Sequence, residues 1–140
     1  MAGNDVVAHL GQVPMFSGCS KKELQAIAKT VREIDHPSGA VIATEGEPGA
    51  GLFVIDEGEA DVTIGGKRVN HLVTGDFFGE MALLDGGPRT ATVTATTDIK
   101  LYALTEWVFR GLLVEYPSIA LRTLEAMASR LRNATKSATG

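Results

Sequence analysis

The apolar residues of this chain follow a helical period near both ends and a strand-like pattern in between. One helical face of residues 21–31 is apolar and consists of Leu24, Ile27, Ala28 and Val31. Ser20, with Glu23 three residues later, has the spacing of a capping box and predicts the start of this helix. The stretch VPMFSG at 13–18 predicts a Pro-led apolar turn packed under the same core. We therefore expect a helical lead-in over residues 5–31.

Residues 32–104 carry the signals of short strands separated by turns. The segments rich in β-branched residues are 41–45, 52–56, 60–64, 68–72, 92–96 and 100–104. Glycine-rich and proline-rich turns separate them. Gly65-Gly66 has the form of a two-residue hairpin turn, because glycine readily adopts positive φ. Short strands with regularly spaced turns are typical of an antiparallel sandwich or barrel, so the middle of the chain is predicted to be mainly β.

After residue 104 the period becomes helical again. Residues 105–116 predict one helix, with Thr105 as its candidate N-cap, and Pro117 interrupts or ends it. Residues 118–134 predict a second helix, with Ser118 as its candidate cap. The apolar residues of the second helix have the spacing of a packing seam and are Leu121, Leu124, Ala128 and Leu131. Two interpretations stay open: the helix packs on its own β-domain, or the seam joins two copies in a homodimer. We expect the polar end from residue 135 to be frayed.

The composition restricts the classes of function. A length of 140 residues suits one domain, and 44% hydrophobic with 21% charged residues is typical of a globular protein. A net charge of −4 argues against a nucleic-acid partner, which needs a basic footprint. No stretch approaches the roughly 20 apolar residues that span a bilayer, and no basic leader precedes an apolar run. The single Cys19 suits a reducing compartment, so we expect a cytoplasmic protein with no membrane partner.

The residues that carry catalytic chemistry are scattered. A cupin-like metalloenzyme or a phosphodiesterase needs clustered metal ligands, whereas His9, His36 and His71 stand far apart with no H-x-H pair. Cys19 has no local sign of a nucleophile's surroundings and is better explained as a partly buried thiol. We therefore expect neither an enzyme nor a metal cofactor.

The stretch FGEMALLDGGPRTATV, residues 78–93, has the features of an anion cradle. Residues 80–84 are long enough for one helical turn, whose unpaired N–H groups suit a phosphate. Gly79 and Ala82 are small enough for an anion to approach that backbone closely. The Gly-Gly-Pro turn then brings Arg89 back towards the same place, and its guanidinium can satisfy two phosphate oxygens.

Glu80 is the unexpected member, because a carboxylate beside an anion is unfavourable unless it has a partner of its own. Arg89 or a hydroxyl group of the ligand would provide one. Phosphate and hydroxyl together indicate a nucleotide. Taken singly, Glu80 is also explained by a helix dipole and Arg89 by a solvated surface position. Finding both, among small residues at 79, 82, 90 and 91, favours the cradle.

The same stretch resembles the phosphate-binding cassette of cyclic nucleotide-binding domains, a family that includes protein kinase A regulatory subunits, the catabolite activator protein and cyclic-nucleotide-gated channels. Its FGE-x-AL motif, followed by Pro-Arg, small residues and valine, meets every position of the family pattern. The resemblance covers about 13–135. It implies a single domain, 1–140, built as an antiparallel β-roll or jelly roll of about eight strands over 32–104. A helical lead-in precedes the roll and two helices over 105–135 follow it.

The resemblance implies roles for the cassette residues. Glu80 matches the glutamate that binds the ribose 2′-hydroxyl, and Arg89 matches the arginine that binds the cyclic phosphate. The positions that offer backbone N–H groups to phosphate or ribose correspond to Gly79, Ala82 and Ala91. Met81 lies in the same turn and is included in the expected ligand-binding set.

Other residues match positions around the base. Leu72 corresponds to the apolar residue on the base side, and Arg130 to a helix arginine that channels place over the purine. Thr135 falls near a hydroxyl with which the activator reaches adenine, partly across its dimer. Thr90 resembles the threonine of cGMP-selective kinase domains, whose hydroxyl reaches the guanine amino group. Threonine also occurs there in cAMP-preferring domains, so the resemblance favours cAMP and leaves cGMP or dual specificity open.

The implied function is a sensor whose ligand moves helices relative to the roll. The hinge and capping residues would be Leu83, Leu84, Trp107, Phe109, Leu112, Leu124, Met127 and Leu131, which ordinary core packing also explains. An effector protein in trans is an expected partner. A protein-interaction module with a vestigial cassette is the alternative outside ligand binding.

Overall fold

The computed structural model describes the backbone of residues 2–49, 51–79 and 86–139 and the side chains of 6–49, 51–79 and 86–133. Its strands are β1 (Arg32–His36), β2 (Val41–Ala43), β3 (Gly51–Glu57), β4 (Ala60–Ile64), β5 (Lys67–Leu72), β6 (Phe77–Phe78), β7 (Thr92–Ala95) and β8 (Ile99–Thr105). Its helices are α1 (Ala2–Gln12), η1 (Pro14–Phe16), α2 (Lys21–Ala28), α4 (Glu106–Glu115) and α5 (Pro117–Thr139). The strands pair antiparallel in two four-stranded sheets, ordered β1-β8-β3-β6 and β2-β7-β4-β5. The predicted β-roll with flanking helices is confirmed.

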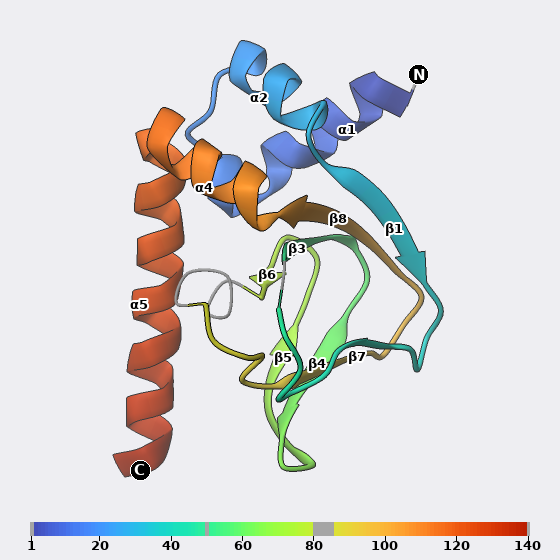
Figure 1. Cartoon of the computed structure of the whole chain (residues 1–140), viewed down its shortest axis with the longest axis vertical. Coiled ribbons are helices and arrows are strands. Elements are labelled where there is room, and N and C mark those ends of the chain that lie inside the picture. The colour runs from blue at the N-terminus through green and yellow to red at the C-terminus, as the bar shows by residue number, and fades with distance from the viewer. Residues whose placement is uncertain (1, 50, 80–85, 140) are drawn as a thin grey trace.

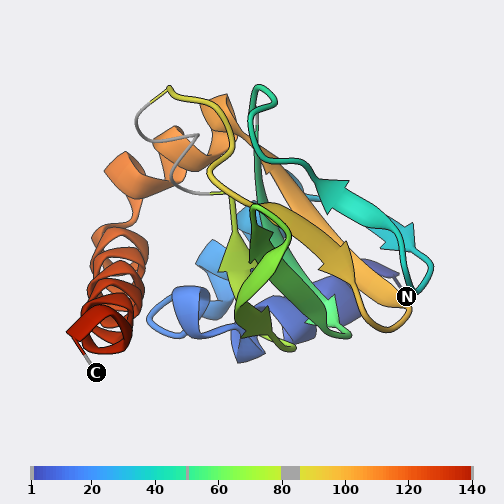
Figure 2. The ribbon, with the colours of Figure 1, turned by 90° about the horizontal axis from the view of Figure 1, so that it is seen from below.

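The helices cover one end and one side of the roll. Figure 1 shows α1, α2 and α4 gathered at one end of the strands, while α5 runs along the side. The view from below in Figure 2 again places α5 beside the roll. Within the described residues, none of these helices combines the length and the apolar character needed to cross a bilayer.

Two apolar cores hold these layers together. One joins the helices to the sheet β1-β8-β3-β6, and its members with at most 1% exposure include Leu10, Phe16, Ile27, Leu52, Tyr102, Phe109 and Ile119. The other lies between the two sheets and includes Ile55, Ala60, Val93, Ile99 and Leu101. Leu101 and Tyr102 are neighbours on β8 but belong to different cores, because successive strand residues face opposite ways.

Several local predictions are confirmed at atomic detail. The Glu23 amide donates to Ser20 Oγ (3.1 Å) and the Ser20 amide donates to Glu23 Oε1 (2.7 Å), which completes the capping box of α2. Thr105 caps α4 by accepting the Val108 amide at 3.2 Å. The two turn glycines between β4 and β5 both have positive φ, as the hairpin turn requires.

The structure corrects two boundaries and adds β1 and β6 to the six predicted strand segments. α5 begins at Pro117, a favoured first helical residue, so Ser118 lies inside the helix and is not its cap. α5 also continues to Thr139, beyond the predicted end at 135, because no proline or glycine interrupts the segment. β1 was not among the predicted strand segments, because it is an edge strand whose charged residues give no apolar alternation.

The predicted seam of α5 faces solvent. Leu121, Leu124 and Leu131 are 57%, 64% and 69% exposed, so the expectation that they pack on their own β-domain is wrong. α5 turns other residues inward, among them Ile119 at 0% exposure. The proposed hinge residues divide in the same way. Phe109 and Leu112 are buried core residues, and Trp107 is 87% exposed. In the described part of the chain, neither Leu124 nor Leu131 is among the residues that line the two cavities beside α5.

Candidate functional site

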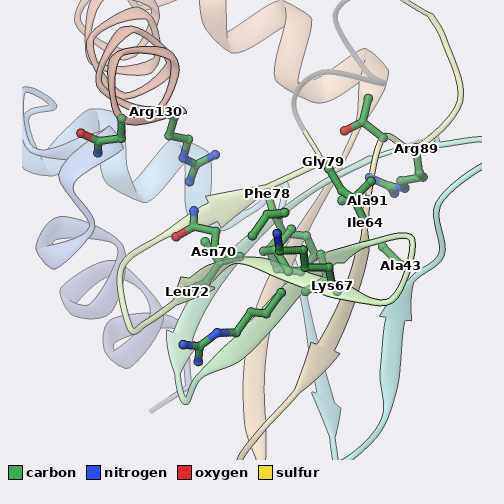
Figure 3. Close-up of a pocket in the computed structure, with 16 residues that line it drawn as sticks. Ala43, Ile64, Lys67, Asn70, Leu72, Phe78, Gly79, Arg89, Ala91 and Arg130 are labelled. Atoms are coloured by element: carbon green, nitrogen blue, oxygen red, sulfur yellow. The ribbon is translucent and has the colours of Figure 1, made fainter. Parts of the chain in front are cut away.

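A cavity of about 680 Å³ opens on one side of the roll, lined by residues from β2, β4, β5, β7 and α5 and from the loop around Arg89 (Figure 3). This volume lies in the usual range of small-ligand pockets, about 300–1,000 Å³. Its apolar floor includes Ala43, Val62, Leu72, Phe78 and Val93. The described lining includes Lys67, Arg68, Arg89 and Arg130 and no acidic side chain. The electrostatic character of this lining therefore suits an anion.

Arg89 is fixed by its backbone. Its amide donates to the Glu47 carbonyl and its carbonyl accepts the Gly46 amide, both at 2.8 Å, which ties the cassette to the turn after β2. Its guanidinium carbon lies 5.6 Å from the centroid of the Phe53 ring, and Phe53 stacks on Phe78 with centroids 5.1 Å apart. The Nη1 atom of Arg89 is buried. The stacked aromatic pair thus contacts the guanidinium, while the two backbone hydrogen bonds set the position of the main chain.

Gly79 makes room for this guanidinium. Its φ is +95°, and a Cβ built there would lie 2.5 Å from Arg89 Nη1 and 2.7 Å from the Gly51 carbonyl oxygen. Side chains rarely adopt that backbone conformation, and no Cβ fits the space. Figure 3 shows Gly79 and Arg89 side by side at one end of the cavity. The sequence reasoning predicted this approach of glycine and arginine, and the structure brings the two residues together.

The other cassette residues fall into two groups. Thr90 and Ala91 line the cavity, with Thr90 exposed and Ala91 half-buried. Glu80, Met81 and Ala82 lie outside the described residues, as do the hinge candidates Leu83 and Leu84.

The opposite end of the cavity is formed by side chains from β5 and α5. Arg130 reaches from α5 to the roll, where its Nη2 donates to the Phe77 carbonyl at 2.5 Å and its guanidinium carbon lies 4.5 Å from the centroid of the Phe77 ring. Leu72, at the end of β5, is 3% exposed and lines the same cavity. Thr135 lies on the backbone of α5 but beyond its described side chains. Leu72 and Arg130 thus line the same cavity, and their base-side role stays a prediction.

Sequence reasoning missed four lining residues of β5, namely Lys67, Arg68, Val69 and Asn70. Val62 pairs with Asn70 and Thr63 with Arg68, so Val69 is the extra residue of a β-bulge, which turns neighbouring side chains. One signal was available for Asn70. It stands two residues before Leu72 and therefore shares a strand face with the predicted base-side residue.

His71 lies on the other face of β5 between two carboxylates. Its Nε2 is 2.7 Å from Glu59 Oε1 and its Nδ1 is 2.6 Å from Asp61 Oδ1. These hydrogen bonds, first to Glu59 and then to Asp61, raise the pKa of His71. A raised histidine pKa means a contribution to stability that is present at low pH and lost as pH rises through the folded-state value. Among the described side chains, no group of three or more His, Cys, Asp or Glu is arranged to hold a metal ion.

Comparison with known proteins agrees with this geometry. Residues 33–116 match the family model of the cyclic nucleotide-binding domain. A curated relative, the cAMP-dependent protein kinase regulatory subunit of Colletotrichum orbiculare, is 40% identical over 116 residues, which cover 81% of this chain. The chain spans about 30% of the length of that relative.

Two solved structures have the same fold. The regulatory domain of Toxoplasma gondii protein kinase A, crystallised with cAMP, aligns with a TM-score of 0.80 at 26% identity over 90% of this chain and 50% of that one. The regulatory subunit of a cAMP-independent protein kinase A from Trypanosoma brucei aligns with a TM-score of 0.83 at 25% identity, over 96% and 49% of the two chains. The family match includes the loop that carries Gly79 and Arg89. This chain belongs to the cyclic nucleotide-binding domain family.

Proposed function

We propose that the chain binds a cyclic nucleotide, with cAMP preferred, and that it acts as a sensor for a partner protein. The observation that carries this proposal is the arrangement of Arg89 at the cavity. Two hydrogen bonds hold the backbone of Arg89, the guanidinium lies over the ring of Phe53, and Gly79 leaves space for it. A fixed cation at the end of an apolar cavity suits a monoanionic ligand with a large uncharged part. A cyclic nucleotide has this form.

Each residue has a proposed role. Arg89 binds the cyclic phosphate, and Glu80 accepts a hydrogen bond from the ribose 2′-hydroxyl. The amides of the cassette turn, at Gly79, Ala82 and Ala91, contact phosphate or ribose. On the base side Leu72 provides apolar contact and Arg130 lies over the purine. The position of Leu72, Arg89 and Arg130 around one cavity supports this division of the site into a phosphate end and a base end.

The sensor function rests on α5. Arg130 links this helix to Phe77 on the roll, so a purine that engages Arg130 changes how α5 is held. A ligand shifts such an equilibrium only by its difference in affinity for the two helix positions. The exposed leucines of α5 are available to a partner, either an effector protein or a second copy in a homodimer.

A second candidate function is an interaction module whose output does not depend on cAMP. The match to a regulatory subunit described as cAMP-independent favours it, because the two folds superpose over most of this chain. The intact Gly79–Arg89 arrangement favours ligand binding instead.

The test is calorimetric titration of the full chain with cAMP, then with cGMP, and with 5′-AMP as the matched control. 5′-AMP keeps the adenine and a phosphate, but it lacks the cyclic phosphodiester ring and carries more negative charge. We expect saturable binding of cAMP, weaker binding of cGMP and little heat from 5′-AMP. Absence of heat and of thermal stabilisation with both cyclic nucleotides at millimolar concentration would overturn the proposal in favour of the interaction module.

A further inference from the structure

Asn70 is a cavity-lining amide for which the proposed site provides no role. It lies on β5 on the same strand face as Leu72, and it lines the cavity together with Leu72 and Arg130. Figure 3 shows Asn70 on the Arg130 side of the cavity, away from Gly79 and Arg89. A ligand with its phosphate at Arg89 and its base towards Arg130 would therefore bring the purine, not the phosphate, to Asn70.

The orientation of the Asn70 side chain is restricted by its neighbour. Its Oδ1 accepts the backbone amide of His71 at 2.8 Å. The ring of His71 is in turn held between Glu59 and Asp61, and Val69 on the other side is the bulge residue. An amide oxygen has two lone pairs and the amide nitrogen has two donors. Within the described part of the chain, Asn70 therefore keeps one acceptor site on Oδ1 and the donors of Nδ2 for a ligand.

These remaining groups complement adenine at position 6. An asparagine amide pairs with adenine in two hydrogen bonds, accepting from the 6-amino group and donating to an adjacent ring nitrogen. A 6-oxopurine such as guanine or hypoxanthine presents an oxygen at position 6. That oxygen would face the acceptor Oδ1, so one of the two hydrogen bonds becomes a repulsive contact.

We propose that Asn70 is the specificity-determining residue that selects adenine over 6-oxopurines in this cavity. The inference deepens the proposed function and rests on it. It assigns the two ends of the purine to different residues: Asn70 discriminates at position 6, whereas a Thr90 hydroxyl acts on the 2-amino group that only guanine carries. The competing candidate is Lys67, because a lysine ammonium pairs with the O6 and N7 acceptors of guanine.

Three ligands separate these contributions. cAMP and cIMP differ in the group at position 6 and in the hydrogen on the adjacent N1, while cIMP and cGMP differ by the 2-amino group. The first ratio of dissociation constants therefore reads the position-6 edge of the purine, and the second reads the 2-amino group. The experiment titrates the full chain and the variants Asn70→Leu, Asn70→Asp and Thr90→Ala with all three ligands. Lys67→Met and Asn133→Ala are the matched controls from the same cavity lining.

We expect the wild-type chain to prefer cAMP over cIMP by about tenfold, the size of one bidentate base contact. Asn70→Leu, which keeps the side-chain volume, should reduce this ratio to about one and leave the cGMP-to-cIMP ratio unchanged. Thr90→Ala should do the opposite. Asn70→Asp keeps the shape of the side chain and loses its two N–H donors. It should weaken the binding of cAMP without strengthening the binding of cIMP or cGMP.

Two results would overturn the inference while leaving the proposed function in place. One is an unchanged cAMP-to-cIMP ratio of dissociation constants in Asn70→Leu. The other is a change of this ratio in Asn133→Ala or Lys67→Met that is as large as the change in Asn70→Leu. Binding of none of the three ligands by the wild-type chain would instead refute the proposed function, and this inference with it. Retention of cAMP binding in either Asn70 variant, with the ratio abolished, would confirm that the variant is folded and that position 6 is read by Asn70.

Discussion

The two ends of the cavity are built by different means. At the Arg89 end, backbone geometry sets the positions: two main-chain hydrogen bonds hold the arginine, and a glycine with positive φ adjoins it. At the Arg130 end, side chains from β5 and α5 meet, and one contact joins residues 53 positions apart in the chain. The residues of the first end that the sequence marks, Gly79 and Arg89, lie in one short stretch, although the backbone partners of Arg89 come from residues 46 and 47. The second end depends on where a whole helix docks.

This difference suits the chemistry of the ligand. The cyclic phosphate is the same in every purine cyclic nucleotide, so a rigid, pre-oriented phosphate site can bind each of them without a change of conformation. The base varies, and its binding is also the event that a sensor must transmit. Side chains on a separate helix can respond to it, because a contact such as that of Arg130 with Phe77 joins α5 to the roll. We therefore expect variants at the two ends to affect different properties.

The largest effect is expected for Arg89→Ala, which should weaken cAMP binding by about 2–5 kcal/mol, because a charged partner of the phosphate is lost in a desolvated site. Calorimetric titration measures this loss. Arg68→Ala is the control: it removes a cation from the same lining that already pairs with Asp61 at 3.6 Å, and it should cost far less. Equal losses in the two variants would show that the cavity attracts phosphate by general charge, and the contrast between its ends would disappear.

Gly79→Ala should come next, as a loss of folding stability of about 1–3 kcal/mol from backbone strain and crowding. The matched control is Gly39→Ala. Gly39 has a similar φ of +91°, but no atom lies within 4 Å of its Cβ position, so that variant reports strain alone. Urea unfolding of both variants isolates the part due to Arg89 Nη1 and the Gly51 carbonyl. If Gly79→Ala is no less stable than Gly39→Ala, the close packing at this end has no energetic weight.

The smallest effect is expected for Arg130→Met. Its free energy of unfolding should fall by about 1 kcal/mol, because a partly exposed hydrogen bond and cation–π contact are lost. Its distinctive result concerns motion. Amide hydrogen exchange of residues 118–133 should become faster in the free protein, and cAMP should slow it less than in the wild-type chain. Arg132→Met, an exposed position on the same helix, should leave exchange unchanged. Exchange insensitive to both Arg130→Met and cAMP would contradict a sensor function for α5.

The cassette itself could be read from the sequence, because its information is local. Gly79 was recognisable by its small size beside a predicted anion site, and Arg89 by the turn that precedes it. The start of α2 at Ser20 was predictable for the same reason, since a capping box needs only residues three apart. Glu80, Met81 and Ala82 remain predictions from the motif.

The base end could not be read in this way. Lys67 lines the cavity on the far side of a bulge in β5 that no local pattern marks. Asn70 shares the strand face of Leu72, but that signal depends on first identifying Leu72. Of the two interpretations of the α5 seam, packing on its own β-domain was wrong, because the structure leaves Leu121, Leu124 and Leu131 exposed. The homodimer stays a prediction. Periodicity shows that a helix has an apolar face and cannot show which surface covers it.

The sequence by itself therefore determined the features that depend on neighbouring residues: where helices begin, where hairpins turn, and which stretch forms the phosphate cassette. Tertiary structure alone decided which edges the strands occupy, which α5 residues turn inward, and which side chains enclose the cavity around Arg89. The physical reason is the range of the interactions. Caps and turns satisfy backbone groups within a few residues, whereas sheet order and helix docking follow from apolar burial shared among segments far apart in the chain.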